Sequence, residues 1–149
     1  MSSLYLDTSC LLKMFFSEPE TDWVLAQVEQ EDRVVVSDLT RLEMLTQVHA
    51  RVEGGSLRRS RAKAMIEHLD EMLTREPFEL VAFTTSSLDA AEQETRQLAK
   101  GRHCRTLDRL HLALLQEQGI KRLLTTDEAQ ARAGRALGLQ VVTFAAGPR

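Results

Sequence analysis

The stretch Leu4-Tyr5-Leu6-Asp7-Thr8-Ser9 decides how this chain folds. Three apolar residues followed by an acid and two hydroxyl residues are typical of a short buried strand that gives way to a helix. The expected helix carries the apolar residues at 11–16 and is broken by Pro19. Asp7 is therefore expected at the end of a strand, where a helix begins.

The same alternation of strand and helix continues along the chain. Ser37 or Asp38 is the expected N-cap of one helix, and Ser86 or Ser87 that of a later one. The strands expected after the first lie at residues 34–36, 78–83, 122–126 and 139–144, and the helices at 23–28, 39–52, 57–73, 87–98, 106–118 and 128–137. This order predicts an α/β fold, a three-layer α/β/α sandwich with a central parallel sheet of about five strands.

Composition limits the class of protein. The 149 residues, 43% hydrophobic and 28% charged, suit a single globular domain over 1–149. Cys10 and Cys104 belong to no metal-ligand pattern, so a zinc ribbon and a disulfide framework are excluded. No apolar run reaches the length of a membrane span, and a cytoplasmic protein is expected. The net charge of -3 means that any nucleic-acid binding must use a local patch.

Four acids stand at strand ends or early in helices: Asp7, Glu43, Asp108 and Asp127. Each alone has a structural explanation, as an N-cap, as a first-turn acid, or, for Glu43, as part of a Thr40-x-x-Glu43 capping box. Taken together, the four acids indicate a shared site rather than four separate helix caps. A parallel sheet brings the ends of its strands to one edge, and ligands bind at that edge. Carboxylates gathered there repel one another unless cations neutralise them.

Oxygen ligands alone, without a Cys or HxxxH pair, suit Mg²⁺ or Mn²⁺ rather than zinc. Such ions activate water against a phosphodiester and stabilise the leaving oxygen. The four acids therefore predict a metal-dependent phosphodiester hydrolase.

Several segments resemble the PIN-domain proteins, and their order and spacing are similar to those of the VapC toxins. They are Leu6–Lys13, Ser37–Glu43, Arg105–Ala113, Leu124–Asp127 and Ala136–Leu139. The resemblance implies a compact α/β/α domain with Mg²⁺- or Mn²⁺-dependent endoribonuclease activity on RNA. It also implies a homodimer that is controlled by a small antitoxin protein from a two-gene pair.

The resemblance carries the acidic quartet over to Asp7, Glu43, Asp108 and Asp127. Thr8, Ser9 and Thr126 are implied as neighbours that hydrogen-bond carboxylates or water. From the sequence itself, Arg102, Arg105 and Arg109 flank Asp108 and are either RNA-phosphate contacts or part of a solvated face. His111, one helical turn after Asp108, is either a hydrogen-bonded core residue or a residue that reaches the metal site.

Other functions are weighed against these residues. A phosphatase of the haloacid dehalogenase-like group needs a second Asp two residues after Asp7, where this chain has Ser9. A receiver domain needs an Asp after the third strand, where this chain has Thr84 and Thr85. A catalytically idle PIN-like module that binds RNA or protein is the non-enzymatic alternative, and the intact quartet disfavours it.

Overall fold

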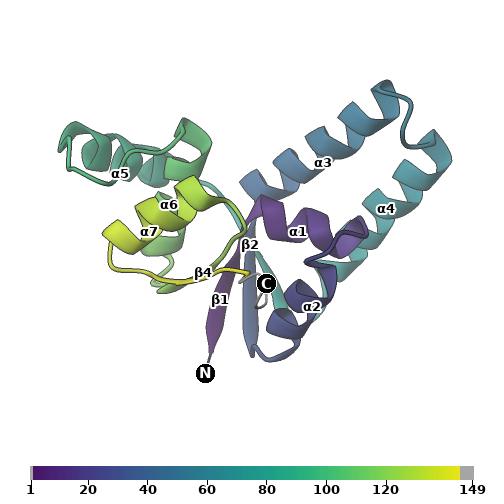
Figure 1. Ribbon diagram of the computed structural model, residues 1–149, viewed down its shortest axis with the longest axis horizontal. Coiled ribbons are helices and arrows are strands. Elements are labelled where there is room, and N and C mark those ends of the chain that lie inside the picture. Colours follow the sequence, from purple (N-terminus) through teal and green to yellow (C-terminus); the bar gives the residue numbers. More distant parts are fainter. Residues whose placement is uncertain (1, 145–149) are drawn as a thin grey trace, which may run out of the picture.

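A parallel sheet with the strand order β3-β2-β1-β4-β5 runs through the computed structural model, which describes residues 2–144 (Figure 1). Every pair of neighbouring strands is parallel. The strands are β1 (Ser3–Leu6), β2 (Arg33–Ser37), β3 (Phe78–Val81), β4 (Arg122–Leu124) and β5 (Gln140–Val142).

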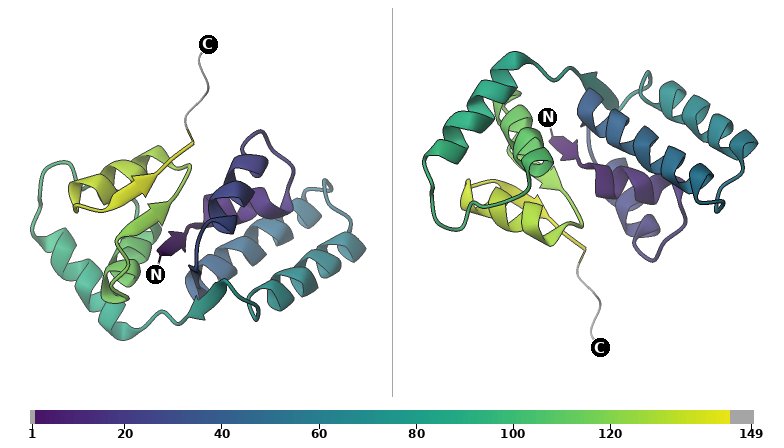
Figure 2. Two further views of the ribbon diagram at one scale, coloured as in Figure 1. Left: turned by 90° about the horizontal axis from the view of Figure 1, so that it is seen from below. Right: turned by 90° about the horizontal axis from the view of Figure 1, so that it is seen from above.

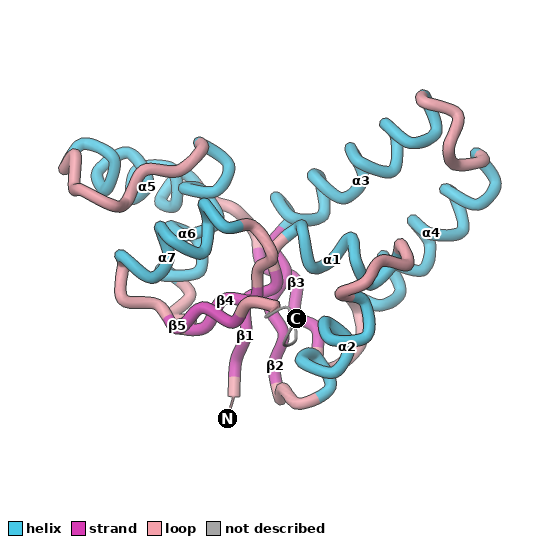
Figure 3. Tube along the Cα trace, viewed as in Figure 1, coloured by secondary structure: helices cyan, strands magenta, loops and turns pink. Residues whose placement is uncertain are grey.

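Helices cover both faces of this sheet, α1 to α4 on one side and α5 to α7 on the other (Figure 3). The helices are α1 (Thr8–Phe15), α2 (Thr21–Glu29), α3 (Asp38–Glu53), α4 (Arg59–Met72), α5 (Thr85–Arg96), α6 (Thr106–Glu117) and α7 (Glu128–Ala136). Figure 2 shows from two further sides that the hairpin of α3 and α4 lies away from α5, α6 and α7. Within residues 2–144, no helix has the length and apolar character that a bilayer crossing requires.

Alternation along the strands divides the core into two parts. Leu4 and Leu6 of β1 pack into the cluster shared with α1 to α4, whereas Tyr5 between them packs into the cluster shared with α6 and α7. Val35 of β2 and Leu123 of β4 lie on the same side as Tyr5. Successive side chains of a strand point to opposite faces, so these short apolar runs are buried on both sides. The three-layer α/β/α fold predicted from the sequence is confirmed.

The strand order places a topological switch between β1 and β4. The chain builds the sheet outward from β1 through β2 to β3, then returns to add β4 and β5 on the other side of β1. The N–H of Asp7 donates to the carbonyl of Leu124 at 3.2 Å, which joins the carboxyl ends of the two central strands. Ligands of parallel sheets bind at such a switch, and Asp7 lies there.

Several element boundaries differ from the sequence-based expectation. Ser37 is the N-cap of α3, as predicted, but α5 begins at Thr85 with Thr84 as its cap, so the prediction of Ser86 or Ser87 is wrong. Four hydroxyl residues in succession hide which one caps, and the Ser87 side chain donates instead to Glu117 at 3.1 Å. β3 ends at Val81 because the chain then turns toward α3, where the Phe83 N–H donates to the Asp38 carboxylate at 2.8 Å.

Packing of α6 against the sheet generates a test. Leu115 of α6 is fully buried (0% exposed), whereas Leu88 of α5 is 51% exposed. Leu115→Ala is expected to lower the free energy of unfolding by about 2–5 kcal/mol, because it leaves a cavity in the second core cluster. Leu88→Ala makes the same change on a surface helix and is expected to cost less than about 1 kcal/mol. Chemical denaturation measures both, and equal losses would contradict the assigned packing.

Candidate active site

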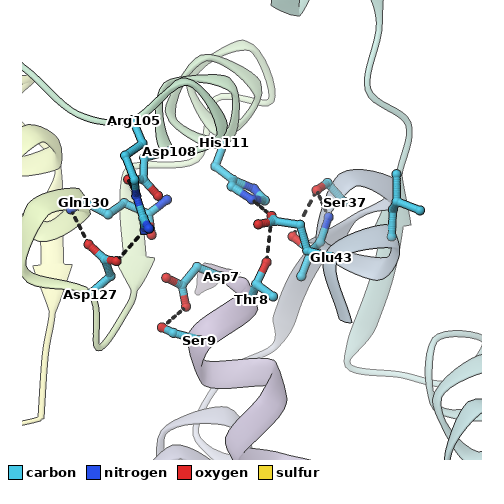
Figure 4. Close-up of polar contacts among 12 residues, drawn as sticks. Asp7, Thr8, Ser9, Ser37, Glu43, Arg105, Asp108, His111, Asp127 and Gln130 are labelled. Atoms are coloured by element: carbon cyan, nitrogen blue, oxygen red, sulfur yellow. Dashed lines mark hydrogen bonds and ion pairs between the residues drawn. The ribbon is translucent and has the colours of Figure 1, made fainter. Parts of the chain in front are cut away.

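All four acids predicted from the sequence line one small cavity of about 80 Å³ at the carboxyl edge of the sheet (Figure 4). They come from the start of α1, from α3, from α6 and from the start of α7, so segments far apart along the chain meet here. The lining residues are Asp7, Thr8, Ser9, Glu43, Arg105, Asp108, His111, Asp127 and Gln130.

Asp7 is the most buried of the acids, with 3% of its surface exposed. It is the N-cap of α1, and its Oδ1 accepts hydrogen bonds from the Cys10 N–H at 3.0 Å and the Ser9 hydroxyl at 2.7 Å. Its Oδ2 accepts from the Thr125 hydroxyl. Burial raises the pKa of Asp7, although the hydrogen bonds from Thr125, Ser9 and Cys10 work in the opposite direction.

Asp127 and Asp108 share a cation, Arg105. Asp127 caps α7 by accepting from the Gln130 N–H at 2.9 Å, and its other oxygen lies 2.8 Å from an Arg105 nitrogen. Asp108, in the first turn of α6, lies 3.2 Å from Nε of the same arginine. The Arg105 side chain is 74% exposed. One guanidinium on the solvent side therefore balances two carboxylates, and the Asp108 side chain of this group is only 9% exposed.

Glu43 is held differently from the other acids. Its Oε1 accepts a hydrogen bond from the Thr8 hydroxyl at 2.9 Å and contacts Nε2 of His111. The capping-box explanation for Glu43 is wrong, because Ser37 occupies the N-cap and accepts from the Thr40 N–H. Burial raises the pKa of Glu43, but the hydrogen bonds and charge supplied by His111 and the hydroxyl of Thr8 outweigh it, and the pKa is lowered overall.

His111 is both a core residue and a residue of the site. It is 3% exposed, and its Nδ1 lies 2.7 Å from the hydroxyl of Tyr5 while Nε2 faces Glu43. Both alternatives that the sequence left open therefore apply, because His111 is a hydrogen-bonded core residue that also reaches the acidic cavity. Tyr5 was not foreseen at the site, because its place in an apolar strand gives no sign that its hydroxyl reaches this far.

The hydroxyl residues near Asp7 follow the prediction only in part. Thr8 and Ser9 contact Glu43 and Asp7 as the resemblance implied. For Thr126 the expectation needs correction, since it contributes its backbone N–H to Ser9 at 3.1 Å, and the hydroxyl that reaches Asp7 is that of Thr125. Side chains alternate along an extended segment, so neighbouring threonines point in opposite directions.

Two of the three arginines proposed from the sequence as phosphate contacts are engaged inside the protein. Arg102 pairs with Glu94 at 2.8 Å, and Arg109 is 8% exposed and donates to the carbonyl of Arg102. Both side chains therefore make contacts within the protein, around the loop before α6. Arg105 is the member of this set that lines the acidic cavity.

The donor set fits a hard divalent cation, provided that the Arg105 side chain moves. Within residues 2–144, no three His, Cys, Asp or Glu side chains are gathered into a ready metal cage. Mg²⁺ and Mn²⁺ sites need only one or two carboxylates together with water, and carboxylate oxygens are the ligands these ions prefer. The guanidinium of Arg105 lies between Asp108 and Asp127, so it must move aside for an ion to contact both.

Comparison with known proteins gives concordant results. The family model of the PIN domain matches residues 4–136 of this chain. Ribonuclease VapC46 of Mycobacterium tuberculosis (strain ATCC 25618 / H37Rv) is 29% identical over 147 residues, which span 95% of this chain and 98% of the relative. Ribonuclease VapC47 of Mycobacterium tuberculosis (strain CDC 1551 / Oshkosh) is 32% identical over 126 residues, 82% of this chain and 79% of the relative.

The fold is also similar to that of solved structures. A chain in the crystal structure of DNA-bound VapBC from Salmonella typhimurium superposes with a TM-score of 0.68. The match covers 96% of this chain and 98% of that one at 18% identity, which establishes the likeness of the fold.

The raised pKa of Asp7 generates a stability prediction. Because the folded state disfavours its ionised form, Asp7 lowers stability as the pH rises from its ordinary pKa through the raised value. Asp7→Asn removes this cost. The new Asn amide can donate to the Thr125 hydroxyl oxygen, while the Thr125 hydroxyl donates its own proton to the side-chain oxygen of Gln130, 3.2 Å away. In chelator at about pH 7 the variant is expected to melt at a higher temperature than the wild type, with a smaller difference near pH 4.

Thermal unfolding followed by circular dichroism measures this difference. Asp70→Asn, at an exposed position of α4, is the matched control and is expected to change the melting temperature little. An Asp7→Asn protein that melts below the wild type near pH 7 would contradict the assigned environment of Asp7.

Proposed function

This chain belongs to the PIN-domain family, and on that premise we propose that it is a metal-dependent endoribonuclease, the toxin of a VapBC-type toxin–antitoxin pair. The observation that carries the proposal is the meeting of four carboxylates from opposite ends of the sequence in one cavity at the topological switch of the sheet. The ribonuclease names of the two mycobacterial relatives support RNA as the substrate.

Asp7, Glu43, Asp108 and Asp127 are the residues that hold the metal, Mg²⁺ or Mn²⁺. When bound, such an ion supplies Lewis-acid chemistry, activating water and stabilising the charge that develops on the phosphodiester during hydrolysis. The chain contributes fixed geometry, because helix caps orient Asp7 and Asp127 and hydrogen bonds from Thr8 and His111 orient Glu43. Orientation of ligands before the reaction is what a protein adds to metal chemistry.

Arg105 is the proposed phosphate contact beside the metal site. Its guanidinium is mostly exposed and already lies between Asp108 and Asp127, at the mouth of the cavity. An arginine there pairs with carboxylates when the site holds no cation and with a substrate phosphate once a metal has neutralised them. Arg102 and Arg109 are left out of this role because both are engaged within the protein.

The proposed partners are an RNA substrate, a small antitoxin protein and a second copy of this chain. The antitoxin is supported by the similarity of this fold to a chain of a VapBC complex. The homodimer follows the family resemblance alone. Both cysteines are free thiols, which suits the reducing cytoplasm where a toxin would meet cellular RNA.

A second candidate function has one observation in its favour. The four acids do not form a ready cage within residues 2–144, and Arg105 pairs with two of them, as it would in an idle PIN-like module that binds RNA or protein. Calorimetric titration with Mn²⁺ separates the two functions. A binding isotherm that is lost in Asp108→Asn supports the nuclease, whereas no heat of binding by the wild type supports the module.

Neutralising Asp108 tests the catalytic role directly. Asp108→Asn is expected to lower the rate of RNA cleavage in Mg²⁺ by about 100-fold or more, because removing a ligand charge removes the ion that stabilises the reaction. The fold should persist, since Asn is isosteric and Arg105 remains solvated. Cleavage of a labelled RNA by purified protein measures this, with exposed Asp70→Asn and added EDTA as controls. An Asp108→Asn protein that cuts at the wild-type rate would refute the mechanism.

Removing Arg105 is expected to move two quantities in opposite directions. Arg105→Ala should bind Mn²⁺ several-fold more tightly, because the competing cation is gone. The same variant should bind RNA more weakly and with a shallower salt dependence, because one phosphate contact is lost. Calorimetry and RNA binding at several salt concentrations measure the two effects, with Arg135→Ala on α7 as the matched exposed control. A variant that loses metal affinity together with RNA affinity would contradict this assignment.

A further inference from the structure

We propose that His111, held in place by Tyr5, is a positioning residue that fixes the Glu43 carboxylate for metal binding. The inference rests on the proposed function, since it concerns how one of the proposed ligands is oriented. It assigns a role to a buried histidine and to a buried tyrosine that the four acids alone do not explain.

Glu43 depends on a positioning residue more than Asp7 and Asp127 do. Asp7 and Asp127 each cap a helix and are held by backbone N–H groups of that helix, those of Cys10 and Gln130. Glu43 lies further into α3, and the donors on it within residues 2–144 are two side chains, Thr8 and His111. A glutamate also has more rotamer freedom to lose than an aspartate. Its position therefore depends on tertiary contacts.

The contacts around His111 form a chain of hydrogen bonds. Nε2 of His111 contacts Glu43, and Nδ1 lies 2.7 Å from the Tyr5 hydroxyl. The Tyr5 hydroxyl donates to Ser37 at 2.9 Å, and Ser37 caps α3 by accepting from the Thr40 N–H at 3.0 Å. This chain of contacts thus begins and ends on α3, the helix that carries Glu43. The Tyr5 contact fixes the orientation of the imidazole, and the imidazole fixes the carboxylate.

The residues behind Glu43 in this chain of contacts are buried. Tyr5 and Ser37 are 0% exposed and His111 is 3% exposed, so water does not compete for their hydrogen bonds. The rings of Tyr5 and His111 also meet edge to face, with centroids 5.9 Å apart. Partners that orient a metal ligand from behind typically change metal affinity or activity by about 10- to 100-fold when they are removed.

Two partial replacements of His111, each by an amide, separate positioning from packing. Gln extends an amide toward the place of Nε2 and keeps a donor near Glu43, whereas Asn reaches only the place of Nδ1 and keeps the contact with Tyr5. Both are polar amides of similar size. His111→Ala removes both contacts, and Tyr5→Phe removes only the hydroxyl. His49→Gln, whose side chain is 73% exposed on α3, is the matched control.

The readouts are the dissociation constant for Mn²⁺, measured by calorimetry on the full chain without RNA, the RNA cleavage rate, and thermal stability. The expected order of Mn²⁺ affinity is wild type, His111→Gln, then His111→Asn together with His111→Ala. The last two should bind about 10- to 100-fold more weakly than the wild type. Tyr5→Phe should fall between the wild type and His111→Asn, and His49→Gln should match the wild type.

The outcomes distinguish this inference from the proposed function. Equal losses of Mn²⁺ affinity in the Gln and Asn variants, or wild-type affinity in both, would overturn the positioning role even if the wild type cleaves RNA. The predicted order of Mn²⁺ affinity without cleavage of any RNA would overturn the nuclease and leave the positioning role standing. Should His111→Ala fail to fold, the comparison of Gln with Asn and the Tyr5→Phe variant decide the question.

Discussion

Repulsion between carboxylates that the sheet topology forces together is the interaction on which the rest of this structure depends. The switch between β1 and β4 brings Asp7 and Asp127 toward one edge, and α3 and α6 add Glu43 and Asp108. Carboxylates that line one small cavity are costly unless donors or cations compensate their charge. Helix N–H groups, hydroxyls, an imidazole and a guanidinium each supply part of that compensation, and the site consists largely of these groups.

The two ways of holding an acid have different origins in the sequence. A helix cap needs only a few consecutive residues, so Asp7 and Asp127 are oriented as soon as α1 and α7 form. Glu43 is oriented by residues that arrive from α1 and α6, and its geometry exists only in the complete fold. The site thus combines two acids fixed locally with at least one fixed by tertiary contacts, and this difference explains why a buried Tyr5–His111 pair lies behind Glu43 in particular.

The same difference sets how much was predictable from the sequence. Short apolar runs that end in acids, alternating with amphipathic helices, were enough for the α/β sandwich and for the gathering of the acids at one edge, because both follow from strand topology. The contact between Thr125 and Asp7 was not predictable, since it depends on which of two adjacent threonines turns inward. The pairing of Arg105 with Asp127 joins the start of α6 to the start of α7, and no pattern along the chain specifies it, whereas its pairing with Asp108 is local, three residues apart.

Arg105 also bears on whether this protein needs a metal ion in order to fold. Metalloproteins whose ligands have no other counter-ion often cannot fold until the metal arrives. Here the chain carries its own cation for Asp108 and Asp127, and Asp7 has hydrogen bonds of its own. We therefore expect that the chain folds without the metal. A chelator is then expected to inhibit the proposed activity reversibly and to leave the protein folded.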